Sequence, residues 1–311
     1  MSNKEFPNVY DANLYNLDSL SCESSIIFTR RTCEISEMCD IAAAHSLDYY
    51  KNGLGIYEIL SLISEDLCFL CHENTGGESS HSTDFCRISD RVSFSSLYLD
   101  RVRKRGVNLT ERSFLPEGND TETFVYVKNP LSDEAYDVFS QEFFDPRVRY
   151  VKSIKDAVKA VNDGDSTYCL LPLEERGGAR LSMVTELVFG NDLKIDSVTP
   201  VFGQDGGADM KYALVSKTFS IPVIEADDDR YLEILLDVDA SLSLSEILTA
   251  ASLFKIEPYR VNTVLLYTED GQKTNYSVVF KGEGKDFSDI LIYLTLFSGS
   301  YVPIGIYKNL E

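Results

Sequence analysis

The last part of the chain has the clearest alternation of apolar and polar positions. Apolar residues dominate 231–236, where Glu233 is the exception, recur at helical spacing over 243–255, and return in short apolar runs separated by one more helical segment. The predicted elements from here to the end are a strand at 231–236, a helix at 243–255, strands at 260–267 and 276–281, a helix at 286–297 and a strand at 302–307. Glu269, Asp270 and Gly271 form a hairpin signal between the two middle strands. The pattern predicts a complete βαββαβ unit.

Short apolar runs also alternate with helical segments in the first two thirds of the chain. The first predicted set is a strand at 26–28, helices at 34–47 and 54–63, and a buried strand at 67–71. The second is a strand at 124–127, a helix at 133–143, a strand at 148–151, a helix at 154–161 and a strand at 168–171. Each set ends in an acidic, glycine-rich turn, so we expect two similar α/β halves in succession.

This order predicts an α/β protein whose first part resembles a two-lobed periplasmic-binding protein and whose second part is ferredoxin-like. Strands at 193–202 and 212–216 are expected to return and close the first lobe. The expected boundaries are a polar tail at 1–24, lobe one at 25–120 plus 205–220, lobe two at 121–204, an acidic linker at 225–229 and the βαββαβ domain at 230–311. Ligands of such proteins lie in the cleft at the ends of the strands.

Charge and composition narrow the range of functions. The 311 residues have a net charge of −21 and contain no basic stripe with interleaved aromatics, which argues against nucleic-acid binding. No stretch approaches the roughly 20 apolar residues that span a bilayer, so we expect no membrane insertion. Seven irregularly spaced cysteines, with no export signal, indicate a reducing cytoplasm.

Cysteines and histidines suggest no cofactor. Residues 68–72 match the haem-attachment spacing Cys-x-x-Cys-His, but Cys68 and Cys71 would point to opposite faces of the expected strand. The three histidines of the chain match no common zinc spacing with these cysteines. We therefore expect buried cysteines, no metal and no cofactor.

Several motifs give the chain a resemblance to the prephenate dehydratase family, whose members join a two-lobed domain to a regulatory ACT domain. Residues 73–77, Glu-Asn-Thr-Gly-Gly, resemble the family's Glu-Asn-Ser turn followed by glycine. Only Pro130 remains of the Ser-His-Pro-Gln turn, and Ser153-Ile154-Lys155 stands where the family has Ser-Thr-Ala. The Thr-Arg-Phe triplet falls at 210–212, Met-Lys-Tyr. The resemblance implies an inter-lobe ligand site.

Site residues follow from this resemblance. It implies ligand binding by Glu73, Asn74, Thr75 and Lys211, with Thr75, Lys211 and Tyr212 as candidates for any catalytic role. Elimination of carboxylate and hydroxide from a dianion requires cationic and hydroxyl donors. Loss of one donor costs about 100- to 1000-fold in rate, and methionine cannot protonate a leaving group. Glu174 and Glu175 are expected to be surface acids beside a glycine-rich turn.

The ACT resemblance also implies regulatory positions. Phenylalanine-binding members carry Gly-Ala-Leu at the first helix and Glu-Ser-Arg-Pro in the second strand, and this chain has Leu242, Ser243 and Leu244, with Asn262 opening the second motif. A leucine at the glycine position would crowd a ligand against the backbone. The domain is then expected to serve mainly as a dimerisation surface.

Three functions remain open from the sequence. The first is a divergent protein of phenylalanine metabolism that binds a small metabolite, such as prephenate or an aromatic amino acid, and regulates rather than catalyses. The second is an active prephenate dehydratase, a carbon–oxygen lyase, with a rebuilt pocket. The third is a scaffold in which the ACT-like domain drives assembly into a homodimer or tetramer.

Overall fold

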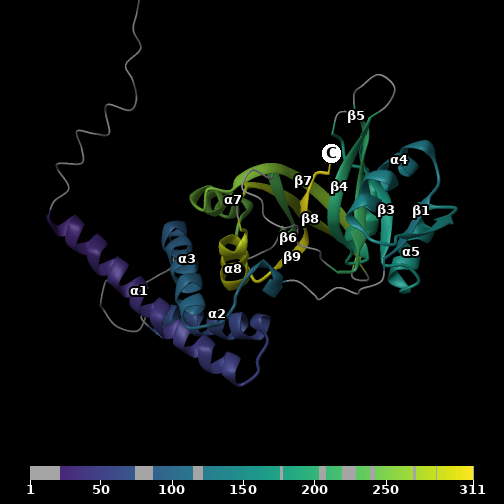
Figure 1. Cartoon of the computed structure of the whole chain (residues 1–311). Helices are drawn as coiled ribbons and strands as arrows, with labels where there is room; N and C mark the ends of the chain where they lie inside the picture. The colour runs from purple at the N-terminus through teal and green to yellow at the C-terminus, as the bar shows by residue number, and fades with distance from the viewer. Residues whose placement is uncertain are drawn as a thin grey trace, which may run out of the picture.

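A computed structural model gives the fold of residues 22–73, 87–114, 122–175, 178–202, 208–218, 229–238, 242–268, 271–284 and 286–310. Three parts are evident in Figure 1: a group of helices from the N-terminal third, a central sheet with two helices, and a separate α/β lobe. Of the tail predicted at 1–24, residues 1–21 lie outside the described residues, as do the linker residues 225–228, whereas residues 22–24 belong to helix α1 (Cys22–Lys51).

The N-terminal third is helical. It consists of α1 (Cys22–Lys51), α2 (Ile56–Glu73) and α3 (Ile88–Lys104), followed by the short 3-10 helix η1 (Glu111–Phe114). The strands predicted at 26–28 and 67–71 are wrong, because both runs lie inside α1 and α2. A short apolar run has the same composition in a buried helix and a buried strand, so periodicity could not separate the two. Buried Ile59, Ile63 and Leu67 recur every four residues, so one buried helical face continues to the first residue of the run that was predicted to be a strand.

The α/β lobe contains the second predicted set of elements. Its strands are β1 (Thr123–Val127), β2 (Arg147–Val151), β3 (Tyr168–Glu175), β4 (Lys194–Phe202) and β5 (Ala208–Ser216), and its helices are α4 (Pro130–Phe139), η2 (Ser140–Glu142), α5 (Ile154–Asn162) and α6 (Ser182–Gly190). The sheet order is β2-β1-β3-β5-β4. Strands β1, β2 and β3 are parallel, and β5 is antiparallel to both β3 and β4.

Two local features start the lobe's helices where they do. The Asn129 side chain accepts hydrogen bonds from Leu131 N and Ser132 N, and Ser153 accepts one from Asp156 N at 3.2 Å. Both caps satisfy amide groups that the first helical turn leaves unpaired. Helix α4 therefore begins at Pro130, ahead of the predicted position, because proline fits the first turn.

Strands β4 and β5 correct the expected two-lobed division. They were expected to close a first lobe, but they join the sheet of β1, β2 and β3. The segment expected to form most of that first lobe is the helical group α1–α3 instead. The described chain therefore has an α/β lobe where the second lobe was expected, and no sheet among residues 22–73 and 87–114.

The βαββαβ unit is present as predicted. It consists of β6 (Asp229–Asp237), α7 (Leu244–Leu253), β7 (Glu257–Thr268), β8 (Gly271–Glu283), α8 (Ser288–Phe297) and β9 (Tyr301–Lys308). Its antiparallel sheet has the order β7-β8-β6-β9, and β7 and β8 form the predicted hairpin. Ser243 and Glu246 form a capping box that starts α7. The ferredoxin-like arrangement of the unit is therefore confirmed.

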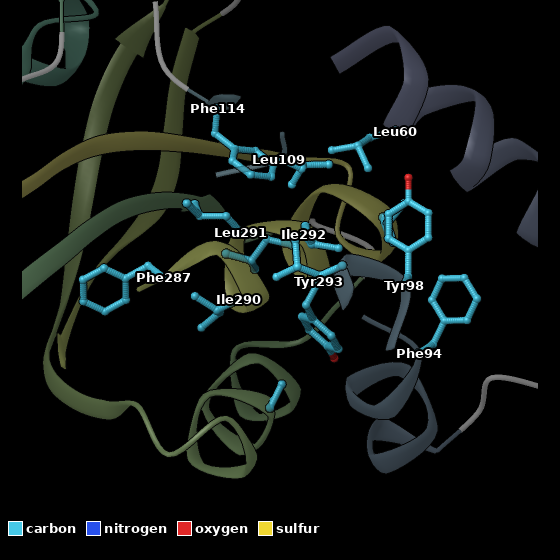
Figure 2. Close-up of a cluster of buried hydrophobic side chains, with 14 of the residues drawn as sticks. Leu60, Phe94, Tyr98, Leu109, Phe114, Phe287, Ile290, Leu291, Ile292 and Tyr293 are labelled. Carbon is cyan, nitrogen blue, oxygen red and sulfur yellow. The ribbon is translucent and has the colours of Figure 1, made fainter. Parts of the chain in front are cut away.

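A hydrophobic core joins the N-terminal helices to this unit (Figure 2). Helix α8 contributes Ile290, Leu291, Ile292 and Tyr293, all fully buried between the sheet and the helical group. Leu60 of α2 and Phe94 and Tyr98 of α3 belong to the same cluster. Helices α2 and α3 thus cover α8, α3 also contacts α7, and α1 packs on the outside of α2 and α3.

A buried ion pair strengthens this attachment. Arg230 of β6 donates to Glu111 of η1, with Nη2 2.7 Å from Oε2, and both side chains are buried. Phe287 N donates to Glu111 Oε1 at 2.6 Å, and the Arg230 guanidinium lies 5.7 Å from the Phe287 ring centroid. Glu111 therefore links η1 both to the sheet and to the start of α8.

The lobe packs against the opposite face of the ferredoxin-like sheet. Tyr231, Leu235 and Tyr307 from that face share a core cluster with the α5 and α6 side of the lobe. At Gly305, an added Cβ would lie 2.3 Å from the Ile195 carbonyl oxygen, so strand β9 approaches the backbone of β4 directly. Leu310 N donates to Val198 O at 2.7 Å, and Lys194 Nζ to Pro303 O at 3.1 Å. The two sheets are joined through main-chain contacts.

Among the described helices, none has the length and apolar character needed to cross a membrane.

Candidate functional site

A cavity lies where the lobe meets the edge of the ferredoxin-like sheet. Its volume is about 420 Å³, within the range of small-molecule sites. One wall is the segment that leads into α6 and the first turns of that helix, and the other is β7 with one residue of β8. The lining residues are Ala179, Arg180, Ser182, Thr185, Glu186, Asn262, Thr263, Val264, Leu265 and Ser277.

Arg180 lines this cavity and reaches across to the ferredoxin-like sheet. Its guanidinium makes a bidentate pair with Glu233 of β6, with N–O distances of 2.6 and 2.7 Å. Glu233 is fully buried and also accepts from Ser277 Oγ at 3.0 Å and Tyr307 Oη at 3.1 Å. Burial opposes the Arg180 charge, but the Glu233 carboxylate and neighbouring groups outweigh it, and the Arg180 pKa is raised.

A second buried carboxylate, Glu174 of β3, neighbours this pair. Arg260 Nη1 of β7 donates to its Oε1 in a close contact, Lys211 Nζ of β5 lies 3.7 Å from its Oε2, and Arg180 Nε lies 3.5 Å from its Oε1. The expectation that Glu174 is a surface acid is wrong, since its side chain is 6% exposed, whereas Glu175 is exposed as expected. Two carboxylates and three cations thus form a nearly balanced buried network between the lobe and the sheet.

Burial beside Glu233 also affects Tyr307. Desolvation, followed by the Glu233 charge, raises the Tyr307 pKa well above its ordinary value. The hydroxyl therefore stays protonated and donates to Glu233 throughout the physiological range. Buried carboxylates need such donors, because an unpaired charge in this environment is strongly unfavourable.

Two polar side chains of the cavity have no partner within the described part of the chain. Asn262 Nδ2 is buried and makes no hydrogen bond there. Glu186, on α6, is exposed at the cavity and forms no ion pair with any described residue. Buried amide donors in native proteins are nearly always satisfied, so Asn262 calls for an acceptor from outside the described chain. The cavity can therefore bind a polar molecule.

The predicted pair Lys211 and Tyr212 lies beside this network, but the two side chains leave β5 on opposite faces. Lys211 faces Glu174, while Tyr212 belongs to the core cluster on the α4 side of the lobe. Burial raises the Tyr212 pKa, and a hydrogen bond with the Asn129 side chain acts in the opposite direction. Alternation along a strand separates neighbouring residues in this way, so these two cannot act on one substrate atom.

The remaining predicted ligand residues are Glu73, Asn74 and Thr75. Asn74 and Thr75 lie outside the described residues, and Glu73 is the last residue of α2. Helix α2 and strand β5 are at opposite ends of the molecule (Figure 1). Prediction of one cleft containing Glu73 and Lys211 depended on a first α/β lobe, and the helical N-terminal third removes that lobe.

The predicted regulatory residues separate into two places. Leu242 is buried in the core cluster shared with α8, and Leu244 packs partly buried against it. Ser243 caps α7 by accepting from Glu246 N. Asn262 is the member of this set that lines the cavity, across the β7–β8 register from Ser277.

Residues that sequence reasoning missed make up most of the site: Arg180, Glu186, Glu233 and Arg260. One signal was available for Glu233, because a charged residue inside the apolar run 231–236 must find a buried partner. Nothing in the sequence identifies Arg180 as that partner, since the two are far apart along the chain.

Comparison with known proteins finds no matching family model and no matching curated protein. Among solved structures, a prephenate dehydratase from Streptococcus mutans is 14% identical with a TM-score of 0.48, covering 61% of this chain and all of that one. The prephenate dehydratase of Arthrobacter aurescens in complex with L-Phe is 12% identical with a TM-score of 0.45, covering 60% of this chain and 89% of its own. GqqA, of a novel type of quorum-quenching acylases, is 15% identical with a TM-score of 0.44, covering 60% of this chain and 95% of its own. Over part of its length, the chain is thus distantly similar to prephenate dehydratases.

Proposed function

We propose that this protein binds a small metabolite in the cavity between α6 and β7 and regulates a process of aromatic amino acid metabolism in the cytoplasm. The observation that carries the proposal is the cavity of about 420 Å³, whose lining includes Asn262 with a buried Nδ2 donor that bonds to no described residue. Phenylalanine and prephenate are the first ligands to test, because the sequence motifs resemble the prephenate dehydratase family.

The arrangement of catalytic candidates favours binding over turnover. Lys211 lies 3.7 Å from Glu174, which reduces its capacity to hold a substrate carboxylate, and Tyr212 is buried on the other face of β5. Arg180 and Arg260 are likewise paired with carboxylates. Elimination from a dianionic substrate needs free cationic donors that converge on it.

A regulatory role follows from where the cavity lies. Its walls come from two units, α6 of the lobe and the β7–β8 hairpin of the ferredoxin-like sheet, which we propose to be an ACT-like domain. A ligand that contacts both walls stabilises their association, and any arrangement with a separated wall binds it less well. Ligand concentration would then control how firmly the lobe is joined to the sheet.

The first experiment is calorimetric titration of the full chain with phenylalanine and with prephenate, with thermal unfolding followed in parallel. A ligand that binds should raise the unfolding temperature with its concentration. Asn262→Leu should weaken binding, whereas Asn275→Leu should not. Asn275 is a matched control, because its buried Nδ2 also makes no hydrogen bond with the described residues and it does not line the cavity. Absence of heat and of any thermal shift with both compounds would exclude phenylalanine and prephenate as its ligands.

An active prephenate dehydratase is the alternative enzyme function. Its test is turnover of prephenate to phenylpyruvate by the purified protein. Activity that Lys211→Ala abolishes, while the variant remains folded, would establish this alternative and overturn the non-catalytic proposal.

A homodimeric scaffold is a second alternative, favoured by the edge of the ferredoxin-like sheet. Strand β7 ends the sheet order and exposes Tyr259, Val261 and Leu265 by 48%, 39% and 44%. Long apolar edge strands readily pair with another strand. Analytical ultracentrifugation should then detect a dimer that Val261→Lys dissociates, and a monomer at all concentrations would eliminate the scaffold.

A further inference from the structure

The charges that line the cavity indicate which ligands it accepts. Arg180 is the lone cation among its lining residues, and Glu233 already engages it through two hydrogen bonds of 2.6 and 2.7 Å. Its remaining Nε lies 3.5 Å from Glu174. A ligand carboxylate would therefore compete with two buried carboxylates for this guanidinium, and separating a buried pair is strongly unfavourable.

Among the charged residues that line the cavity, Arg180 is neutralised by an ion pair, whereas Glu186 is not. It is on the second turn of α6, exposed at the cavity, and has no ion-pair partner within the described ranges. The net charge of −21 for the chain adds a negative potential around it. Electrostatics at the cavity thus oppose an anion and attract a cation.

The hydroxyl groups of the lining reinforce this preference. Thr185 Oγ1 donates its proton to Leu181 O at 3.1 Å, and Ser277 Oγ donates to Glu233 Oε1 at 3.0 Å. With its proton committed, the Thr185 oxygen offers lone pairs to a ligand, whereas Ser277 is 1% exposed and serves Glu233. A ligand ammonium has three N–H donors and no acceptor, which suits a wall of carboxylate and hydroxyl oxygens.

Asn262, in contrast to these acceptor oxygens, presents a hydrogen-bond donor. Its buried Nδ2 lacks a partner in the described structure and needs an acceptor. Val264 and Leu265, beside it on β7, give the same wall an apolar component. The cavity therefore combines acceptors on the α6 wall with a donor and apolar surface on the β7 wall.

We infer that the ligand is a small primary amine with an uncharged hydrogen-bond acceptor and an apolar portion, its ammonium facing Glu186 and its acceptor facing Asn262. This inference rests on the proposed function, because it concerns the same cavity. It reverses the charge expected from the family resemblance, which implies a dianionic or carboxylate ligand.

Three probes with one apolar portion and different charge test it on the full chain: L-phenylalaninol, a cation with a hydroxyl group; L-phenylalanine, a zwitterion; and 3-phenylpropionate, an anion. Calorimetry at pH 7 should give phenylalaninol the highest affinity and phenylpropionate an affinity about 10-fold lower or weaker, as expected for one charge pair at a partly exposed site. Phenylalaninol binding should also weaken with added salt.

Substitutions test the contribution of each wall to binding separately. Glu186→Gln should weaken phenylalaninol several-fold and reduce its salt dependence, while Glu257→Gln, which removes the same charge from β7 outside the cavity, should have little effect. Asn262→Leu should weaken phenylalaninol but not 2-phenylethylamine, which lacks the hydroxyl group. Asn275→Leu controls for the substitution itself.

The outcomes distinguish the two proposals. Binding of phenylpropionate as tightly as phenylalaninol, or phenylalaninol binding that Glu186→Gln leaves unchanged, would overturn the amine inference and leave metabolite binding intact. Failure of all four probes, together with prephenate, to bind would overturn the proposed function itself.

Discussion

Arg180 and Glu233 form a buried, bidentate ion pair between the α/β lobe and the ferredoxin-like sheet, with N–O distances of 2.6 and 2.7 Å. Arg180 is 9% exposed and Glu233 is fully buried. Arg180 also lines the cavity, so the residue that joins the two units borders the proposed binding site. Its removal is expected to affect both stability and binding.

Arg180→Met leaves Glu233 buried without its cation. We expect it to lower the free energy of unfolding by about 3–5 kcal/mol, the range for breaking one partner of a buried pair. Urea unfolding monitored by circular dichroism measures this. The double variant Arg180→Met with Glu233→Met should recover much of the loss, because no unpaired charge remains. A double variant no more stable than Arg180→Met would contradict this account.

The second buried pair, Glu111 and Arg230, is predicted to hold the N-terminal helices on the sheet. Glu111→Gln weakens the interaction with Arg230 and the hydrogen bond from Phe287 N. We expect it to lower the free energy of unfolding by about 2–4 kcal/mol. Asp145→Asn is the matched control, since Asp145 and Arg147 are 76% and 80% exposed and 4.0 Å apart. Equal unfolding free energies for the two variants would refute a structural role for Glu111.

Gly305 tests the direct approach of the two sheets. In Gly305→Ala the new methyl would lie 2.3 Å from Ile195 O, so β9 and β4 must separate, at a cost of about 1–3 kcal/mol. Gly190→Ala provides the control, because no atom lies within 4 Å of an added Cβ there. The unfolding temperatures of both variants measure this effect. A Gly305→Ala protein as stable as the parent would show that the sheets do not pack this closely.

Tyr98 should make the protein sensitive to alkaline pH. Burial raises its pKa from 10.0 to about 12, while the Ser46 hydrogen bond partly opposes the shift. The unfolded state loses this proton at lower pH than the folded state, so the contribution is complete below about pH 10 and is lost as pH rises toward 12. Between these values Tyr98→Phe should lose stability less steeply with pH, by up to about 1.4 kcal/mol per pH unit. Parallel curves for parent and variant would contradict the shift.

How much could be predicted from the sequence differed between regions. The hairpin at 269–271 and the helical spacing of Leu244, Ile247 and Ala251 are local signals, and the βαββαβ unit that they predicted is present. At 67–71 the same reasoning failed, because five apolar residues satisfy a strand and a buried helix equally well. That error removed the expected first lobe and, with it, the expected cleft.

Within the site, sequence reasoning found Lys211 and Asn262 and missed most of their partners. Lys211 and Asn262 came from the family resemblance, and both lie at the junction of the lobe and the sheet. Glu174 was expected on the surface because it precedes a glycine-rich turn. Its burial results from Arg260 on β7, which is brought to it by packing of the two units.

Interactions between residues close in the sequence specify the strands, the capped helix starts and the hairpin of the C-terminal unit. Only the folded chain reveals that β4 and β5 join the sheet of β1–β3, that α2 and α3 cover α8, and that Arg180 meets Glu233. The two groups of features differ in the distance along the chain over which the interactions act. Capping, turn chemistry and periodicity act over a few residues, whereas burial of a charge is possible only where the complete fold brings its partner to it.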